Sequence, residues 1–183
     1  MKITELPLKN AYVLEPEPFT DHRGKFVRIY CFNELQRICH SKPIVQINHS
    51  LSKLKGTVRG MHFQYRPKAE TKIIKCMRGS VFDVIIDIRR GSSTFLQWHG
   101  EVLSAENMKM MYIPEGFAHG FQVLEENIEL LYLHTELYNR EHEGCVSYDD
   151  PAISISWPLE VADISEKDQN HPLLSKDFAG IVL

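Results

Sequence analysis

The sequence lacks any long apolar run. No stretch of its 183 residues approaches the roughly 20 apolar residues that a helix needs to cross a bilayer. The N-terminal residues, MKITELPLKN, also lack the apolar core of a signal peptide. We therefore expect a cytoplasmic protein without a membrane partner.

Blocks of basic residues are missing as well. The chain has 21 Lys and Arg against 24 Asp and Glu, which gives a formal net charge of −3. Proteins that follow a phosphate backbone carry clusters of Lys and Arg. We therefore expect no nucleic-acid partner.

The cysteines show no metal-binding or redox pattern. None stands in a CxxC pair, and the spacing is unlike that of metal ligands. The four residues are Cys31, Cys39, Cys76 and Cys145. We expect free thiols in a reducing compartment.

Helix signals are scarce, and nothing in the composition marks a domain boundary. Only Phe32 to Ile38, with Asn33 as its N-cap, and a turn after Ser165 favour helix. Short segments rich in β-favouring residues predict strands around 44–51, 57–65, 72–77, 80–88, 95–103, 109–113, 119–123, 128–135 and 145–148. With 43% hydrophobic residues, the composition is that of a globular protein. We therefore expect one all-β domain over residues 1–183, a sandwich or barrel.

The N-terminal part adds two strands and an arm. Residues 11–14 and the segment KFVRIY, residues 25–30, favour strand, and DHRG between them favours a turn. The proline-punctuated PEPF predicts an extended arm, which could pair with another subunit.

The stretch from Gly56 to Lys72, GTVRGMHFQYRPKAETK, concentrates polar side chains in a segment that otherwise favours strand. Strand alternation predicts that Arg59 and Met61 face one side and that Gly60 and His62 face the other. A histidine beside several cations, outside any uniform charge run, indicates a cavity that receives an anion and moves a proton.

Eight collinear blocks of the sequence resemble the signature of one enzyme family. The most specific is RGMHFQ, Arg59 to Gln64, with Lys72 ten residues after its histidine. The others are DHRGKF, DVIIDIR, LSAEN, IPEGFAHGF, YDDP, ISWP and SEKD. Together they resemble the dTDP-4-dehydrorhamnose 3,5-epimerases, which implies a cupin-type jelly-roll homodimer and an isomerase that needs no cofactor.

One of these blocks also resembles the wider cupins. Pro114, Gly116 and His119 have the P-x-G-x-x-H spacing of the second cupin motif, which aims a histidine at the barrel interior. Metal-binding cupins supply His-x-His from the first motif. Here the matching strand offers His62 and then Gln64. Because the second histidine is missing, we expect no metal at that position.

The resemblance to the epimerases implies four catalytic roles. His62 is the base that removes a proton from the carbon next to the C4 ketone of the sugar, and Asp168 orients it. Lys72 lies beside the C4 oxygen and stabilises the enolate. Tyr132 returns a proton on the opposite face. Without the resemblance, each residue has an ordinary interpretation as a structural, solvated or packing side chain.

The resemblance also implies a set of substrate-binding residues. Arg23 and Arg59 match residues that hold the diphosphate, and Phe26 and Tyr138 match aromatics that sandwich the base. Arg23 and Phe26 are expected to come from the neighbouring subunit, so that a homodimer completes each site. His119 either faces the sugar or supports the jelly roll, and the seven other histidines match no role. The full set is Arg23, Phe26, Arg28, Gln46, Asn48, Arg59, His119 and Tyr138.

Two departures from the family pattern concern the substrate. Where the family usually carries a glutamate, this chain has Arg28. Arginine only donates hydrogen bonds, so an arginine facing the base would suit the acceptors of cytosine or guanine. If it turns to solvent, the base is thymine, which we favour. The usual Gln-Gly before the lysine is replaced by Glu70 and Thr71, which changes the polarity near the diphosphate.

We therefore predict an epimerase that inverts C3 and C5 of dTDP-4-dehydro-6-deoxy-D-glucose and gives dTDP-4-dehydro-L-rhamnose, a precursor for cell-surface polysaccharide. One alternative is a C3-only or C5-only epimerase acting on a CDP- or GDP-linked 4-keto sugar. Alternatives of another class are a metal-dependent cupin dioxygenase and a sugar-binding cupin without turnover.

Overall fold

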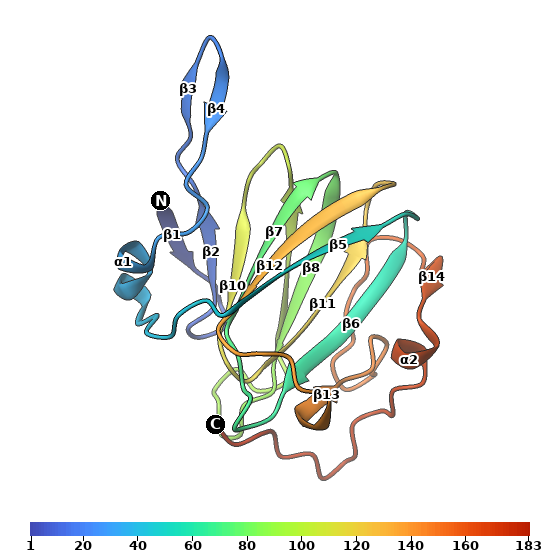
Figure 1. Ribbon diagram of the computed structural model, residues 1–183. Helices are drawn as coiled ribbons and strands as arrows, with labels where there is room; N and C mark the ends of the chain where they lie inside the picture. Colours follow the sequence, from blue (N-terminus) through green and yellow to red (C-terminus); the bar gives the residue numbers. More distant parts are fainter.

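The computed structural model describes residues 1–183, which form two large sheets with only short helices (Figure 1). The first sheet has the spatial order β1 (Lys2–Glu5), β2 (Tyr12–Glu15), β10 (Met110–Ile113), β7 (Lys72–Arg78), β12 (Ile128–His134) and β5 (Gln46–Ser52). The second has the order β13 (Glu143–Cys145), β6 (Thr57–Gln64), β11 (Phe117–Val123), β8 (Ser80–Asp87) and β9 (Trp98–Ser104). The predicted all-β class is confirmed.

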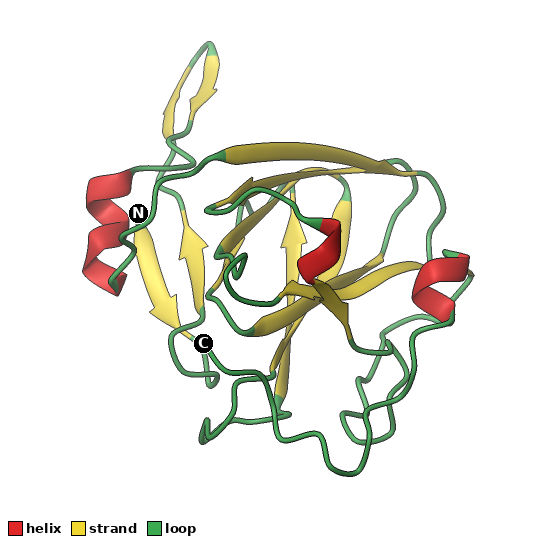
Figure 2. Ribbon diagram, turned by 60° about the horizontal axis from the view of Figure 1, so that its bottom comes forward, coloured by secondary structure: helices red, strands yellow, loops and turns green.

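The smaller elements lie at the periphery of the sheets. A hairpin of β3 (Phe19–Asp21) and β4 (Gly24–Phe26) projects away from the body (Figure 1). The helices α1 (Phe32–Leu35) and α2 (Glu166–Gln169) lie on opposite sides of the strands (Figure 2). The remaining elements are two 3₁₀ turns, η1 (Gln36–Ile38) and η2 (Arg140–His142), and the short strand β14 (Asp163–Ile164), which pairs parallel to β6. None of the helices is long and apolar enough to span a membrane.

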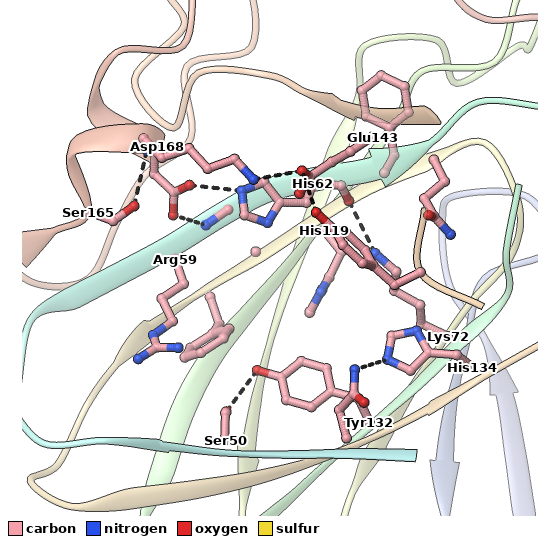
Figure 3. A pocket seen from close by; sticks show the side chains of 18 of the residues that line it. Ser50, Arg59, His62, Lys72, His119, Tyr132, His134, Glu143, Ser165 and Asp168 are labelled. Atoms are coloured by element: carbon pink, nitrogen blue, oxygen red, sulfur yellow. Dashed lines mark hydrogen bonds and ion pairs between the residues drawn. The ribbon is translucent and has the colours of Figure 1, made fainter. Parts of the chain in front are cut away.

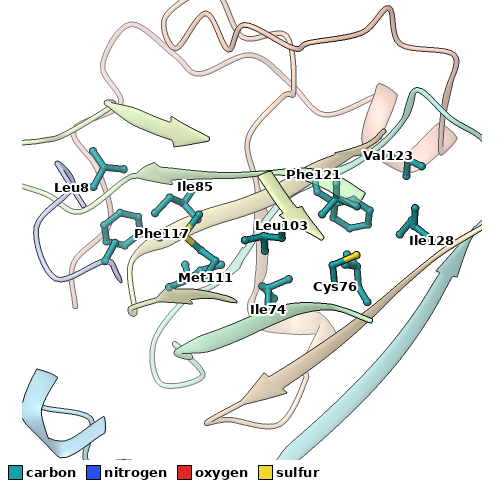
Figure 4. Packing of buried hydrophobic residues seen from close by; sticks show 14 residues of the cluster. Leu8, Ile74, Cys76, Ile85, Leu103, Met111, Phe117, Phe121, Val123 and Ile128 are labelled. Carbon is teal, nitrogen blue, oxygen red and sulfur yellow. The ribbon is translucent and has the colours of Figure 1, made fainter. Parts of the chain in front are cut away.

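The hydrophobic core lies between the two sheets. Ile74 and Cys76 of β7 pack in one cluster with Ile85 of β8, Leu103 of β9 and Phe121 of β11 (Figure 4). Alternate residues of a strand point to the same face, so each sheet contributes one set of side chains to this layer. Burial of this apolar surface stabilises the packing of the two sheets against each other.

The second sheet is covered on its outer face as well. Met61 of β6 and Ile86 of β8 pack there against Ile153 and Ile181, which belong to the C-terminal segment. A strand buried on both faces has no polar side to present to water. This double burial explains why β8 is a nearly continuous apolar run.

Most predicted strands correspond to β5 to β12 with shifts of a few residues at their ends, and the predicted turn after Ser165 is α2. Two predictions were wrong. The strand predicted for KFVRIY ends at Phe26, because Ile29 and Tyr30 pack instead against the cluster around Leu35. The first helix begins after Cys31, so Asn33 lies inside it and does not cap it.

The alternation predicted along β6 was also wrong at Arg59, because the strand contains a bulge. His62 pairs with His119 of β11, but the next pair joins Arg59 to Phe121, so three steps along β6 oppose two along β11. The extra residue turns Arg59 to the same side as His62, while Met61 packs in the outer cluster.

Gly60 makes this bulge feasible. Its φ is +120°, a conformation that side chains disfavour, and a Cβ there would lie 2.5 Å from Cα of Gly120. The Gly60 N–H donates a hydrogen bond to Oδ2 of Asp168 at 3.1 Å. The same glycine therefore positions both a cavity strand and a carboxylate.

The cysteines offer a test of the core. All four are free thiols, with Cys76 buried and Cys39 exposed. Burial raises the pKa of Cys76 to about 11, so the reactive thiolate is scarce at neutral pH. We expect iodoacetamide to alkylate Cys39 in the folded protein and Cys76 only after unfolding, as read by peptide mass spectrometry. Equal rates for the two thiols in the folded protein would contradict the packing.

Candidate active site

A cavity of about 600 Å³ opens between the two sheets. Strands β5, β7 and β12 of the first sheet and β6 and β11 of the second form its walls, and residues in and beside α2 close one end (Figure 3). Nine of the twelve predicted site residues line it: Gln46, Asn48, Arg59, His62, Lys72, His119, Tyr132, Tyr138 and Asp168.

His62 and Asp168 form a hydrogen-bonded pair on the β6 wall. Nε2 of His62 lies 2.8 Å from Oδ1 of Asp168. Asp168 is also fixed by the Gly60 N–H, and its own backbone N–H donates to Oγ of Ser165, the N-cap of α2. Burial of Asp168 favours its neutral form, but the hydrogen bonds from His62 and Gly60 outweigh this and hold its pKa below the usual range.

The carboxylate fixes the tautomer of the histidine. An ionised Asp168 can only accept a hydrogen bond, so a neutral His62 carries its proton on Nε2 and leaves Nδ1 with a free lone pair. A histidine held in this way by a third group can take a proton from a substrate.

Tyr132 stands on the opposite wall, on β12 of the first sheet (Figure 3). Its hydroxyl lies 3.1 Å from Oγ of Ser50, and its ring stacks on that of His134 with centroids 6.1 Å apart. Burial raises the pKa of Tyr132 to about 12. Its hydroxyl therefore keeps its proton at neutral pH and is able to donate it.

Lys72 begins β7 on the same wall as Tyr132, reaches towards β6 and is held by a buried carboxylate. Its Nζ is 3.2 Å from Oε1 of Glu70 and donates to the backbone oxygen of His62 at 3.4 Å. The other Glu70 oxygen lies 2.7 Å from Nδ1 of His134. Burial would raise the pKa of Glu70, but the hydrogen bond from His134 and the charge of Lys72 together lower it. Glu70 is therefore ionised.

A chain of hydrogen bonds fixes the tautomer of His134 as well. The backbone N–H of Tyr138 donates to Oε1 of Gln46, so the Gln46 amide nitrogen donates to Oδ1 of Asn48. The Asn48 amide then donates to Nε2 of His134, at 3.4 Å. His134 thus carries its proton on Nδ1 and donates it to Glu70. This chain links Lys72 to Tyr138 along one wall.

Replacing Glu70 by glutamine tests this arrangement. The side chains of Glu70 and Lys72 are only 7% and 11% exposed. Loss of one charge should lower the free energy of unfolding by about 3 kcal/mol, because it leaves a buried ammonium without its partner. The measurement is urea unfolding. Glu129→Gln, in the more exposed pair with His49, is the control and should cost less than about 1 kcal/mol; equal losses would contradict the buried pair.

His119 extends the polar surface on the second sheet. Its Nε2 lies 2.8 Å from Oδ1 of Asp83, and the Asp83 side chain has no exposed surface. Burial raises the pKa of Asp83. The ring of His119 also meets that of Tyr132 edge-on, with centroids 6.5 Å apart, so side chains of the two walls contact each other.

Comparison with known proteins identifies the family. The family model for dTDP-4-dehydrorhamnose 3,5-epimerase matches residues 5–176. The chain belongs to this family. It is 47% identical over 171 residues to the dTDP-4-dehydrorhamnose 3,5-epimerase of Pseudomonas aeruginosa, which covers 92% of this chain and 93% of the relative.

Solved structures of dTDP-4-dehydrorhamnose 3,5-epimerases have the same fold. The enzyme from Bacillus anthracis, with TDP and PPi bound, superimposes with a TM-score of 0.91 at 41% identity. The aligned region covers 94% of this chain and 99% of the Bacillus anthracis chain. A dTDP-6-deoxy-D-glucose-3,5-epimerase from Legionella pneumophila, in complex with dTDP-4-keto-L-rhamnose, has a TM-score of 0.89 at 37% identity, with coverages of 94% and 92%.

Three predicted site residues of this epimerase-family chain lie outside its own cavity. Arg23 and Phe26 are on the projecting β3–β4 hairpin, where the Arg23 side chain is 79% exposed and pairs with Asp21, and Phe26 is 73% exposed. Arg28 follows the hairpin and donates to Glu34 at 2.8 Å. Within a single chain Arg28 binds an acidic neighbour outside the cavity, as expected if it turns away from the base, and its contact with the substrate stays a prediction.

The cavity also contains residues outside the predicted set of catalytic and substrate-binding residues: Ser50, Glu70, His134, Glu143, Ser165 and Lys167. The sequence could have indicated two of them. Ser50 and His134 each lie two residues beyond a predicted site residue on the same strand and so share its face. Nζ of Lys167 lies 2.7 Å from Oε2 of Glu143, and the same oxygen accepts a hydrogen bond from the Tyr138 hydroxyl. No local pattern identifies them, because they come from separate short elements.

Proposed function

We propose that this chain inverts C3 and C5 of dTDP-4-dehydro-6-deoxy-D-glucose to give dTDP-4-dehydro-L-rhamnose. The observation that carries the proposal is the pairing of a carboxylate-held histidine with a protonated tyrosine on opposite walls of one cavity (Figure 3). Inversion requires removal of a proton from one face of a carbon and return of a proton to the other. A base on β6 and an acid on β12 meet that requirement.

The chemistry follows from the protonation states. Nδ1 of His62 takes the proton from the carbon next to the C4 ketone, and the imidazolium that forms is stabilised by Asp168. Lys72 stabilises the negative charge on the enolate oxygen. Tyr132 then donates its proton to the opposite face of the same carbon. His62 returns its proton to water and Tyr132 regains one before the second carbon reacts.

We propose that residues 1–183 form one cupin-type jelly-roll domain and act as a homodimer. Two facing antiparallel sheets support the jelly roll. The hairpin supports the dimer, since Phe19 and Phe26 are 76% and 73% exposed there, more than expected for aromatics without a partner surface. In this dimer the hairpin of one chain brings Arg23 and Phe26 to the other chain's cavity.

The nucleotide is then held from both chains. Arg59 on the bulged part of β6 and Arg23 from the neighbouring chain bind the diphosphate, for which guanidinium groups are suited. Phe26 and Tyr138 stack on the base. The free thiols suit the reducing cytoplasm, which we propose as the compartment.

The test is incorporation of deuterium. The protein is incubated in heavy water with dTDP-4-keto-6-deoxyglucose and, in parallel, with its CDP counterpart, and the label is located by NMR and mass spectrometry. Label at both C3 and C5 of the dTDP sugar is the expected result. Label at one carbon only, or only in the CDP sugar, would favour the single-centre epimerase and return Arg28 to consideration. No label in either sugar would contradict the proposal.

A further inference from the structure

One histidine beside the His62–Asp168 pair has no hydrogen-bond partner. His171 follows α2, and its side chain is only 9% exposed. Its buried Nε2 lies 3.5 Å from Oδ1 of Asp168 but makes no hydrogen bond. Buried polar atoms are almost always satisfied, so this unpartnered nitrogen, which faces a carboxylate, is free to bind a ligand.

Three side chains here form a metal-ligand set. The ligand atoms of His62, Asp168 and His171 all lie within 4.8 Å of one another. Zinc binds nitrogen and oxygen ligands at about 2.0–2.2 Å, so the three side chains would have to move closer together to hold an ion between these atoms. Two imidazoles and one carboxylate are ligands that Zn²⁺ accepts, with a further position left open.

The surroundings hold the set in place. The second oxygen of Asp168 accepts from the Gly60 N–H, and the Ser165 cap fixes the start of α2. The rings of His62 and His171 meet edge-on with centroids 5.8 Å apart. Ligands that are oriented by such outer contacts bind a metal more tightly than free side chains do.

We propose that His62, Asp168 and His171 bind a divalent transition metal of the Zn²⁺ type, and that this ion inhibits the enzyme. The inhibition follows from the tautomer. A metal on Nε2 of His62 moves the ring proton to Nδ1, so the lone pair that would take the substrate proton is lost. The inhibition rests on the proposed function, whereas the binding does not.

The first experiment uses the unaltered protein. After treatment with a chelator, long-range ¹H–¹⁵N spectra of the imidazoles are recorded with and without Zn²⁺ and in the absence of substrate. The expected result is a shift of the Nε2 resonances of His62 and His171 and of no other histidine. A shift at other histidines, or no shift, would overturn the proposal.

The second experiment compares two variants by calorimetric titration with Zn²⁺. His171→Gln should weaken binding by about tenfold or more. His49→Gln, on the exposed face of β5, should leave the affinity unchanged. Equal affinities of the two variants would overturn the site, and circular dichroism establishes that each is folded.

The final arm measures turnover. Zn²⁺ should inhibit the wild-type protein reversibly, EDTA should restore turnover, and inhibition of His171→Gln should need about tenfold more Zn²⁺. Binding without inhibition would overturn the inhibitory half of the proposal. A protein that binds Zn²⁺ at this site but lacks turnover when metal-free would instead contradict the proposed function, so the two failures are distinct.

Discussion

Replacing His62 by asparagine should lower epimerase turnover by about 10²–10⁴-fold, the contribution expected of a positioned general base. Asparagine preserves a polar side chain of similar size beside Asp168 but has no lone pair of comparable basicity. The measurement is turnover at saturating dTDP-4-keto-6-deoxyglucose, with the product quantified by NMR. Binding of the nucleotide should change little, because in the proposed mechanism His62 acts on the sugar.

The matched control is His49→Asn, on the exposed face of β5. It removes a histidine from β5, another strand of the cavity wall, without changing the residues that line the cavity, and it should keep wild-type turnover. Heavy-water exchange supplies a second readout, since His62→Asn should also abolish deuterium incorporation at both carbons. Wild-type turnover in His62→Asn would refute the mechanism.

Replacing Tyr132 by phenylalanine should lower the rate of inversion by about 10²–10⁴-fold, but through a different step. The pKa of about 12 keeps the Tyr132 hydroxyl protonated, and phenylalanine keeps the ring that stacks on His134 while removing that proton. His62 remains able to take a proton and return one to the same face. The variant should therefore exchange deuterium into unchanged substrate while forming little product.

A loss of inversion without a loss of deuterium exchange would show that Tyr132 donates a proton and is not only a structural side chain. Ser50→Ala is the matched control, because the Ser50 hydroxyl makes a hydrogen bond with the Tyr132 hydroxyl at 3.1 Å and so orients it without supplying the proton. It should slow inversion far less than Tyr132→Phe. If exchange and inversion fall together in Tyr132→Phe, Tyr132 does not act as the acid.

Site residues that lie close together in the sequence could be predicted from it. His62 and Lys72 lie on neighbouring stretches of a recognisable motif, and strand alternation places Ser50 and His134 on the faces of predicted site residues. Asp168 is different, since it lies 106 residues from His62 in the sequence. Only the family resemblance suggested the partnership, because no periodic pattern reports that β14 and α2 return to β6.

The error along β6 has a local physical cause. Arg59 faces the cavity because a bulge at Gly60 changes the phase of the strand, and a bulge cannot be read from alternation alone. Arg28 binds Glu34 within its own chain, and its role in recognising the base stays a prediction.

The projecting hairpin has a genetic consequence. In the proposed dimer, each cavity takes His62 from one chain and Arg23 from the other. In a cell that makes one chain defective at His62 and a second defective at Arg23, random pairing produces mixed dimers in which one cavity carries both defects and the other carries neither. About a quarter of all cavities would be intact. Two alleles that are each inactive alone would therefore complement each other.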